Sequence, residues 1–172
     1  MSYTLYDAAL TLSKDALSAL ENIVKKAQAS PAAASIPAAR IHADMLPFTF
    51  QVHMVTNTLN KMVCRLTGET PPELENNLST YDEILSRIAD VRKSLDAAPG
   101  KAAINARADE SVTIGMGPGK EATMLTWQYV HGYIIPNVFF HTVTAYDIAR
   151  KEGVDVGKMD FLTPFMGKFV GM

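Results

Sequence analysis

The stretch PNVFFHTVTAY, Pro136 to Tyr146, lies inside a segment that otherwise has the apolar pattern of one long helix. Its proline cannot donate a backbone hydrogen bond, and the proline ring clashes with the preceding helical turn. The stretch also places Asn137 and His141 four residues apart, so both side chains lie on one helical face. We therefore expect a last helix, from about Trp127 to about Lys151, that is kinked at the proline and carries a polar pair beside the kink.

Three amphipathic helices are predicted before this one. Their apolar residues recur at three-to-four spacing from Leu5 to Ala27, from Phe48 to Leu66 and from Ile84 to Leu95. Gly68 is placed to end the second helix, and Thr80 with Glu83 has the spacing of a capping box that opens the third. The segment from Ser30 to Arg40 is rich in proline and alanine and is expected to form a long crossover connection.

The pattern changes between the third helix and the last. Val112 and Ile114 alternate with polar residues, and the run is interrupted at Gly117-Pro118-Gly119, which predicts a short β-hairpin. Thr126 is expected to cap the last helix. The C-terminal segment GVDVGKMDFLTPFMGKFVGM contains too many glycines to predict a further long helix, although its phenylalanines need cover. The expected fold is all-α with one appended hairpin, in a single domain covering residues 1–172.

Composition excludes several classes of function. Sixteen basic and eighteen acidic residues leave no basic field for nucleic acid. No apolar run approaches the ~20 residues that span a bilayer, so we expect no membrane partner. The single cysteine, Cys64, rules out an internal disulfide and favours a cytoplasmic protein. Nine methionines and the apolar C-terminal segment suggest surface that a second copy covers, so a homodimer is expected.

Helical geometry separates the candidate polar residues of the second helix and of the connection before it. At about 100° per residue, Gln51 lies at the edge of the apolar face, whereas His53 points away from it. His131 lies opposite the polar side of the last helix and is expected at the surface. Asp44, beside His42, is expected to cap the second helix, with Pro47 in its first turn.

Tyr129, Tyr133, Asn137 and His141 are spaced by four and form a continuous polar and aromatic stripe on the last helix. One interpretation is structural, in which Asn137 and His141 satisfy the kinked backbone or a neighbouring helix. The other is that the kink opens a pocket and the stripe lines it. The two tyrosines alone would favour burial with one hydroxyl hydrogen bond each.

Two stretches carry a family resemblance, ADMLPFTFQV at residues 43–52 and PNVFFHTVTAYDIARKEGVDVGKMDF at residues 136–161. They resemble the domain-of-unknown-function family numbered nineteen ninety-three, within the DinB/YfiT-like superfamily of four-helix bundles. The resemblance covers nearly the whole chain. It implies an up-down-down-up bundle with a long crossover, usually a dimer, with a site between the second and last helices and no established activity.

The superfamily typically holds a divalent metal with three histidines, one on the second helix and an HxxxH pair on the last. Here the corresponding positions are Gln51, Asn137 and His141, and neutral amides are poor metal ligands. Asp44 could add a carboxylate, but the set remains weak, so we expect no metal and no other cofactor. The same side chains suit hydrogen bonding to a small polar ligand.

Three functions therefore stay open. The first is a small-molecule-binding bundle, or a metal-independent enzyme in which His141 is the acid or base while Gln51, Asn137, Tyr133, Tyr129 and Asp44 contact the ligand. The second is a metal-dependent transferase or hydrolase with His141 and Asp44 as ligands. The third is a structural or interaction protein whose polar stripe fixes the helix register. Composition does not separate these functions.

Overall fold

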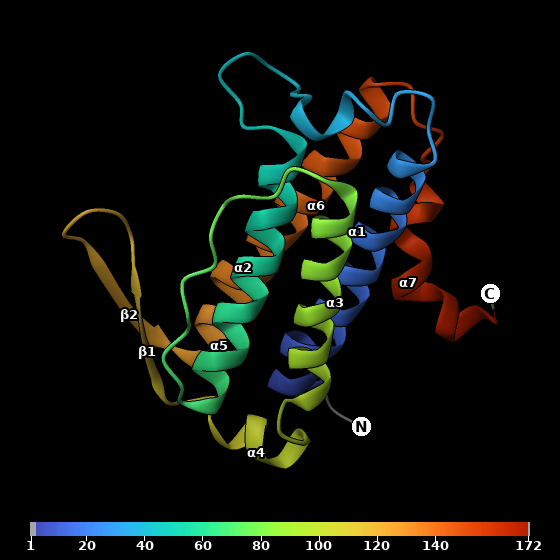
Figure 1. Cartoon of the computed structure of the whole chain (residues 1–172). Coiled ribbons are helices and arrows are strands. Elements are labelled where there is room, and N and C mark those ends of the chain that lie inside the picture. The colour runs from blue at the N-terminus through green and yellow to red at the C-terminus, as the bar shows by residue number, and fades with distance from the viewer. Residues whose placement is uncertain (1–2, 172) are drawn as a thin grey trace.

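The long helices α1 (Leu12–Gln28), α2 (Phe48–Thr67), α3 (Tyr81–Ala97) and α6 (Ile135–Lys151) lie side by side in the computed structural model, which describes residues 3–171 (Figure 1). The shorter elements are η1 (Asp7–Thr11), η2 (Ile36–Ala38), α4 (Lys101–Ala106), β1 (Ser111–Gly115), β2 (Glu121–Leu125), α5 (Thr126–Tyr129), η3 (Val130–Ile134) and α7 (Lys158–Val170). The predicted mainly helical fold is confirmed.

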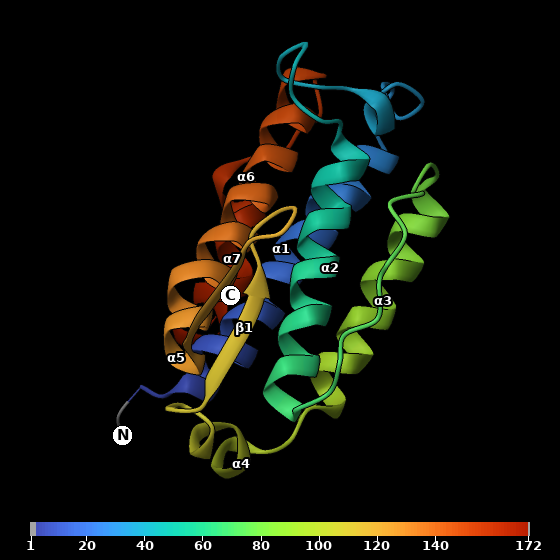
Figure 2. The ribbon, with the colours of Figure 1, turned by 90° about the vertical axis from the view of Figure 1, so that its left-hand side faces the viewer.

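The hairpin prediction is also confirmed, since β1 and β2 pair antiparallel with Val112 opposite Met124. Figure 2 shows the hairpin lying across the side of the molecule where α2 faces α5 and α6. The apolar faces of α1, α2 and α6 meet in a core in which Leu20, Leu59 and Ile148 are fully buried. The hairpin therefore covers one edge of the contact between α2 and the continuous helix formed by α5, η3 and α6. This helix corresponds to the predicted last helix and keeps that name below, although α7 follows it in the chain.

Two of the connections between the long helices are long segments of chain. Residues 29–47, which contain η2, join the end of α1 to the start of α2 at the same end of the molecule (Figure 1), so the crossover expected in this segment is wrong. Residues 68–80 return in an extended path along α2 and α3 to the start of α3 (Figure 2). The predicted end of the second helix and the predicted start of the third lie at the two ends of this segment. Gly68 ends α2 with a left-handed φ of 82°, and Thr80 and Glu83 form the capping box.

Two predicted helix caps are wrong. Asp44 does not cap α2, because the residue before its first turn is Pro47 and the carboxylate of Asp44 instead contacts His42 in the exposed connection. Thr126 is already inside α5, and its hydroxyl donates a hydrogen bond to the carbonyl of Glu110 at 2.9 Å. In both cases a nearby segment offers the polar side chain a partner other than the helix end.

The C-terminal helix α7 corrects the expectation that the glycines there prevent a further helix. Asp160 accepts a hydrogen bond from the Gly157 N–H at 2.7 Å, which opens the helix. Ion pairs of 2.9 Å from Asp160 to Lys26 and of 2.6 Å from Lys168 to Asp15 join α7 to α1. Packing on a neighbouring helix therefore outweighs the low helix propensity of glycine and proline.

The last helix is continuous through Pro136, but it contains a wide turn before the proline. In η3 the N–H of Ile135 donates to the carbonyl of Val130, five residues earlier instead of four. This widened turn gives the proline ring room beside the preceding turn, where it would otherwise clash. The expected local break at Pro136 is therefore a π-turn over residues 130–134.

Among residues 3–171, no helix combines the length and the apolar character needed to cross a membrane.

Candidate functional site

The contact between α2 and the last helix contains a polar pair. Nδ1 of His141 lies 2.7 Å from Oε1 of Gln51, and Gln51 is buried. His141 therefore points inward, towards Gln51. Phe50 lies beside the pair, with its ring centroid 6.2 Å from that of His141.

The hydrogen bonds of Gln51 fix the proton on His141. Nε2 of Gln51 donates to the carbonyl of Leu46 at 2.9 Å, and a carbonyl can only accept. The amide oxygen of Gln51 must then face His141, so Nδ1 of His141 is the donor. In the neutral imidazole this leaves Nε2 without a proton, as a hydrogen-bond acceptor or proton acceptor.

Burial determines the charge of this imidazole. Loss of hydration lowers the pKa of His141 to about 4, because the charged form is disfavoured away from water. His141 is therefore neutral at physiological pH. A neutral imidazole with a free Nε2 lone pair suits the recognition of a ligand N–H or O–H group.

A second set of contacts joins the same two helices nearer the hairpin. The rings of Tyr129 and Tyr133 stack with centroids 5.9 Å apart, and Arg65 of α2 donates to the hydroxyl of Tyr129 at 3.1 Å. Tyr129 is fully buried, and this burial raises its pKa to about 12. Its hydroxyl therefore stays protonated, accepts from Arg65 and keeps one proton to donate.

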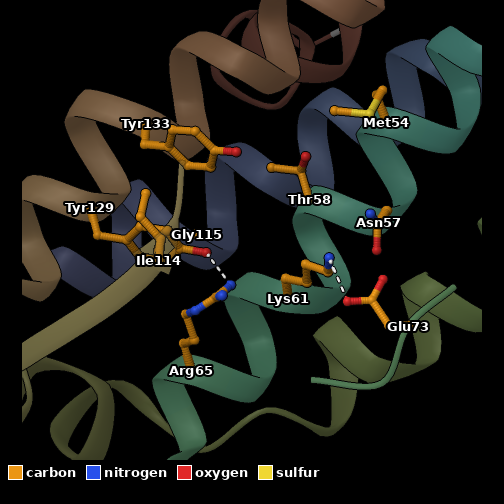
Figure 3. Close-up of a pocket in the computed structure, with 10 residues that line it drawn as sticks. All are labelled: Met54, Asn57, Thr58, Lys61, Arg65, Glu73, Ile114, Gly115, Tyr129 and Tyr133. Carbon is orange, nitrogen blue, oxygen red and sulfur yellow. Dashed lines mark hydrogen bonds and ion pairs between the residues drawn. The ribbon is translucent and has the colours of Figure 1, made fainter. Parts of the chain in front are cut away.

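A pocket of about 320 Å³ opens beside these tyrosines (Figure 3). Residues of α2, the loop after α2, β1 and the start of the last helix line it: Met54, Asn57, Thr58, Lys61, Arg65, Glu73, Ile114, Gly115, Tyr129 and Tyr133. In Figure 3 the Tyr133 ring reaches from the last helix towards Thr58 of α2. The pocket lining thus includes two of the six predicted site residues.

Asn137 lies between these two groups, one helical turn from Tyr133 and one from His141. Its Oδ1 is buried and has no hydrogen-bond partner among residues 3–171, and the same holds for Oδ1 of Asn57 in the pocket wall. A buried acceptor without a partner costs stability, so each oxygen calls for a donor such as water or a ligand.

Asp44 stands apart from the other candidates. It lies in the connection before α2, where its side chain is 82% exposed and contacts His42. Neither hydrogen bond nor ion pair joins it to Gln51 or His141 within the described chain. Asp44 is therefore not assembled with the polar pair.

His53 corrects another expectation, because it is buried instead of facing outward. Its pKa is lowered by burial first and then by the nearby cations Arg87 and Lys61. Glu73 of the return segment also acts on this pKa, so groups distant in sequence lie near His53, which a helical wheel cannot anticipate. The other prediction, of an exposed His131, is confirmed.

The sequence interpretation missed Lys61, Arg65 and Asn57, because none of them belongs to a recognisable motif. A signal was present on α2, however. At about 100° per residue, Lys61 and Arg65 lie within roughly 80° of Gln51 around the helix axis. A helical wheel of α2 that continued from Gln51 to Arg65 would have placed both cations on the side that faces Tyr129 and Tyr133.

The donor set does not fit a divalent transition metal. The three positions to which the sequence resemblance assigns metal ligands hold Gln51, Asn137 and His141, and two of these side chains are neutral amides. No group of three or more histidine, cysteine, aspartate or glutamate residues is suited to hold a metal ion in the part of the chain described. Hydrogen-bond chemistry is what these side chains can supply.

Comparison with known proteins identifies relatives of the chain. The family model described as "Domain of unknown function (DUF1993)" matches residues 5–162. A crystal structure described as a DinB family member protein from Shewanella denitrificans is 32% identical, with a TM-score of 0.80, and the match covers 92% of this chain and 91% of that chain. No curated protein matches the chain significantly. The resemblance inferred from the sequence is confirmed.

The low pKa of His141 predicts a specific pH dependence. The folded-state pKa, about 4, lies below the ordinary value of 6.5, so the unfolded chain binds the proton more tightly. The stability tied to neutral His141 is complete above pH 6.5 and is lost as the pH falls from 6.5 towards 4. We expect NMR titration of its imidazole to give a midpoint near pH 4, and a His141→Asn variant to lose less stability over that interval. A midpoint near 6.5 would refute the burial that we describe.

Proposed function

The chain belongs to the DUF1993 family, and we propose that it binds a small polar molecule between α2 and the helix formed by α5, η3 and α6. The observation that carries this proposal is the pocket of about 320 Å³ beside Tyr129 and Tyr133. Its size is at the lower end of the usual range for small-molecule sites. The unpartnered Oδ1 of Asn57 in the pocket wall adds support, since a bound ligand would supply the missing donor.

The proposal extends to the architecture around the site. We describe the long helices as a DinB-like up-down-down-up four-helix bundle, within one domain, with residues 68–80 as the crossover. The return of residues 68–80 along α2 and α3 supports this topology, because it lets α2 and α3 run in the same direction (Figures 1 and 2). We also propose a cytoplasmic location, on the single cysteine Cys64.

A metal-independent reaction is compatible with the same side chains. His141 would accept a proton at Nε2, while Gln51 holds its Nδ1–H, and Asn137 and Tyr133 would orient the ligand. The metal-dependent transferase or hydrolase is the weaker candidate, because Asp44 contacts His42 instead of the polar pair. A purely structural role of the stripe is the remaining alternative, and it predicts no response to ligands.

Ligand binding predicts a measurable stabilisation of the wild-type protein. We expect at least one compound of a panel of small polar metabolites, at about 100 times its Kd, to stabilise the fold by about 2.7 kcal/mol. For a chain of this size that corresponds to a rise in Tm of roughly 5–10 °C by differential scanning fluorimetry.

The matched variants for this measurement are His141→Ala and Thr142→Ala. Thr142 is buried next to His141 but its hydroxyl donates to the backbone carbonyl of Val138, so it serves as the control. His141 lies outside the pocket lining, so His141→Ala is expected to weaken the response to a ligand that extends from the pocket past Asn137 to the polar pair, at a cost of about 1 kcal/mol of stability. If His141→Ala loses about 3 kcal/mol of stability and no compound stabilises the wild type, Gln51 and His141 have only a structural role.

The donor set also predicts the metal content. Protein purified without a histidine tag should contain far less than one equivalent of zinc, nickel or manganese by elemental analysis, because two strong ligands are replaced by Gln51 and Asn137. The double variant Gln51→His/Asn137→His would restore three imidazoles and is expected to gain zinc. One equivalent of metal in the wild type would contradict this account.

A homodimer is the proposed assembly. Phe161 and Phe165 pack against Phe139 within the chain, but Phe140 and Val143 on α6 are 61% and 42% exposed. Because such apolar surface is usually covered, we expect light scattering to give a dimer at micromolar concentration and Phe140→Glu to shift it to monomer. A strictly monomeric wild type would exclude the dimer.

A further inference from the structure

The charges of the pocket are unevenly distributed. Lys61 and Arg65 lie one helical turn apart on α2, and both line the pocket. The single acidic residue of the lining is Glu73, whose side chain is 88% exposed and whose Oε1 lies 3.4 Å from Nζ of Lys61. An ion pair of this length at an exposed position contributes little, so Glu73 can be displaced at small cost.

Arg65 has most of its hydrogen-bonding capacity unused. One of its N–H groups donates to the hydroxyl of Tyr129, and the guanidinium carbon lies 5.5 Å from the centroid of the same ring. Within residues 3–171, Arg65 forms no ion pair, whereas Arg92 and Arg107 each have a glutamate partner. The guanidinium therefore offers several further donors, held in position by a fully buried ring.

The neutral polar groups of the pocket can donate hydrogen bonds as well. The hydroxyls of Thr58 and Tyr133 form no hydrogen bond to any described residue, although Thr58 is only 6% exposed. Tyr129 can still donate its own proton. The unpartnered acceptor in the wall is Oδ1 of Asn57. The lining thus suits a ligand with a negatively charged group and at least one hydrogen-bond donor.

We propose that the pocket binds a small organic anion, whose carboxylate or phosphate lies between the guanidinium of Arg65 and the ammonium of Lys61. Glu73 is the group that the ligand displaces from Lys61. The rest of the ligand contacts Tyr133 and Asn57. This inference rests on the proposed small-molecule function and specifies its ligand class, because a planar guanidinium recognises both kinds of anion through paired hydrogen bonds.

Isothermal titration calorimetry with two matched pairs of probes tests the inference. Benzoate is compared with benzamide, its neutral near-isostere, and phenyl phosphate with phenol, which lacks the charged group. We expect at least one anion to bind wild type with a Kd at least about tenfold below that of its neutral partner, since hydrogen bonds to charged groups are the stronger ones. Which anion binds more tightly distinguishes a carboxylate site from a phosphate site.

Three variants assign the binding to these side chains. Arg65→Gln and Lys61→Gln should each raise the Kd of the anion about tenfold or more, while Lys93→Gln on α3, whose side chain is 78% exposed, should leave it unchanged. Glu73→Gln should lower the Kd, because it removes the competing carboxylate without touching the core. If Arg65→Gln does not fold, the test rests on the other two variants. Lys61→Gln should raise the Kd of the anion, and Glu73→Gln should lower it.

The outcomes separate this inference from the proposed function. Equal binding of the neutral and anionic probes, or unchanged anion binding in Lys61→Gln and Glu73→Gln, would overturn the anion assignment. If only uncharged metabolites stabilise the wild type, the anion assignment is overturned, but the proposed small-molecule function is not. Absence of binding by all four probes, together with no stabilisation by any panel compound, would overturn both.

Discussion

The missing N–H of Pro136 is the constraint on which the site depends. In an unbroken α-helix, Tyr129 and His141 would point about 120° apart, because twelve residues at about 100° each do not close a whole turn. The π-turn at Val130–Ile134 absorbs one extra residue and brings that angle down to about 20°. Both side chains then face α2, as their contacts with Arg65 and Gln51 show.

This register gives the contact between α2 and the last helix two polar parts with different chemistry. Near the connection that precedes α2, a neutral His141 is held by Gln51 and presents an unprotonated nitrogen. Near the hairpin, the cations of α2 and two stacked tyrosines surround the pocket. Asn137 lies between the two parts with an unpartnered oxygen. A ligand in the pocket, with its anionic end at Arg65, is the arrangement that uses the donors on this face.

Features governed by local geometry were predictable from sequence, and those governed by distant segments were not. The stop at Gly68, the capping box of Glu83 and the burial of Gln51 beside the apolar face all follow from spacing along one helix. The environment of His53 includes Arg87 and Glu73, which are distant in sequence, and α7 depends on its packing against α1, to which ion pairs join it. The pocket was not predicted, because its cations lie on α2, its tyrosines lie on the last helix and its edge is formed by the hairpin.

The most direct test of the central claim is an NMR titration of ¹⁵N-labelled protein with benzoate and phenyl phosphate, following the backbone amides and the Nε–H signal of Arg65. We predict that the largest changes occur at Arg65 Nε–H, along residues 57–65 and along residues 129–133, and that benzamide and phenol produce much smaller ones. Changes confined to other surfaces, or none with either anion at millimolar concentration, would contradict a ligand site between α2 and the last helix.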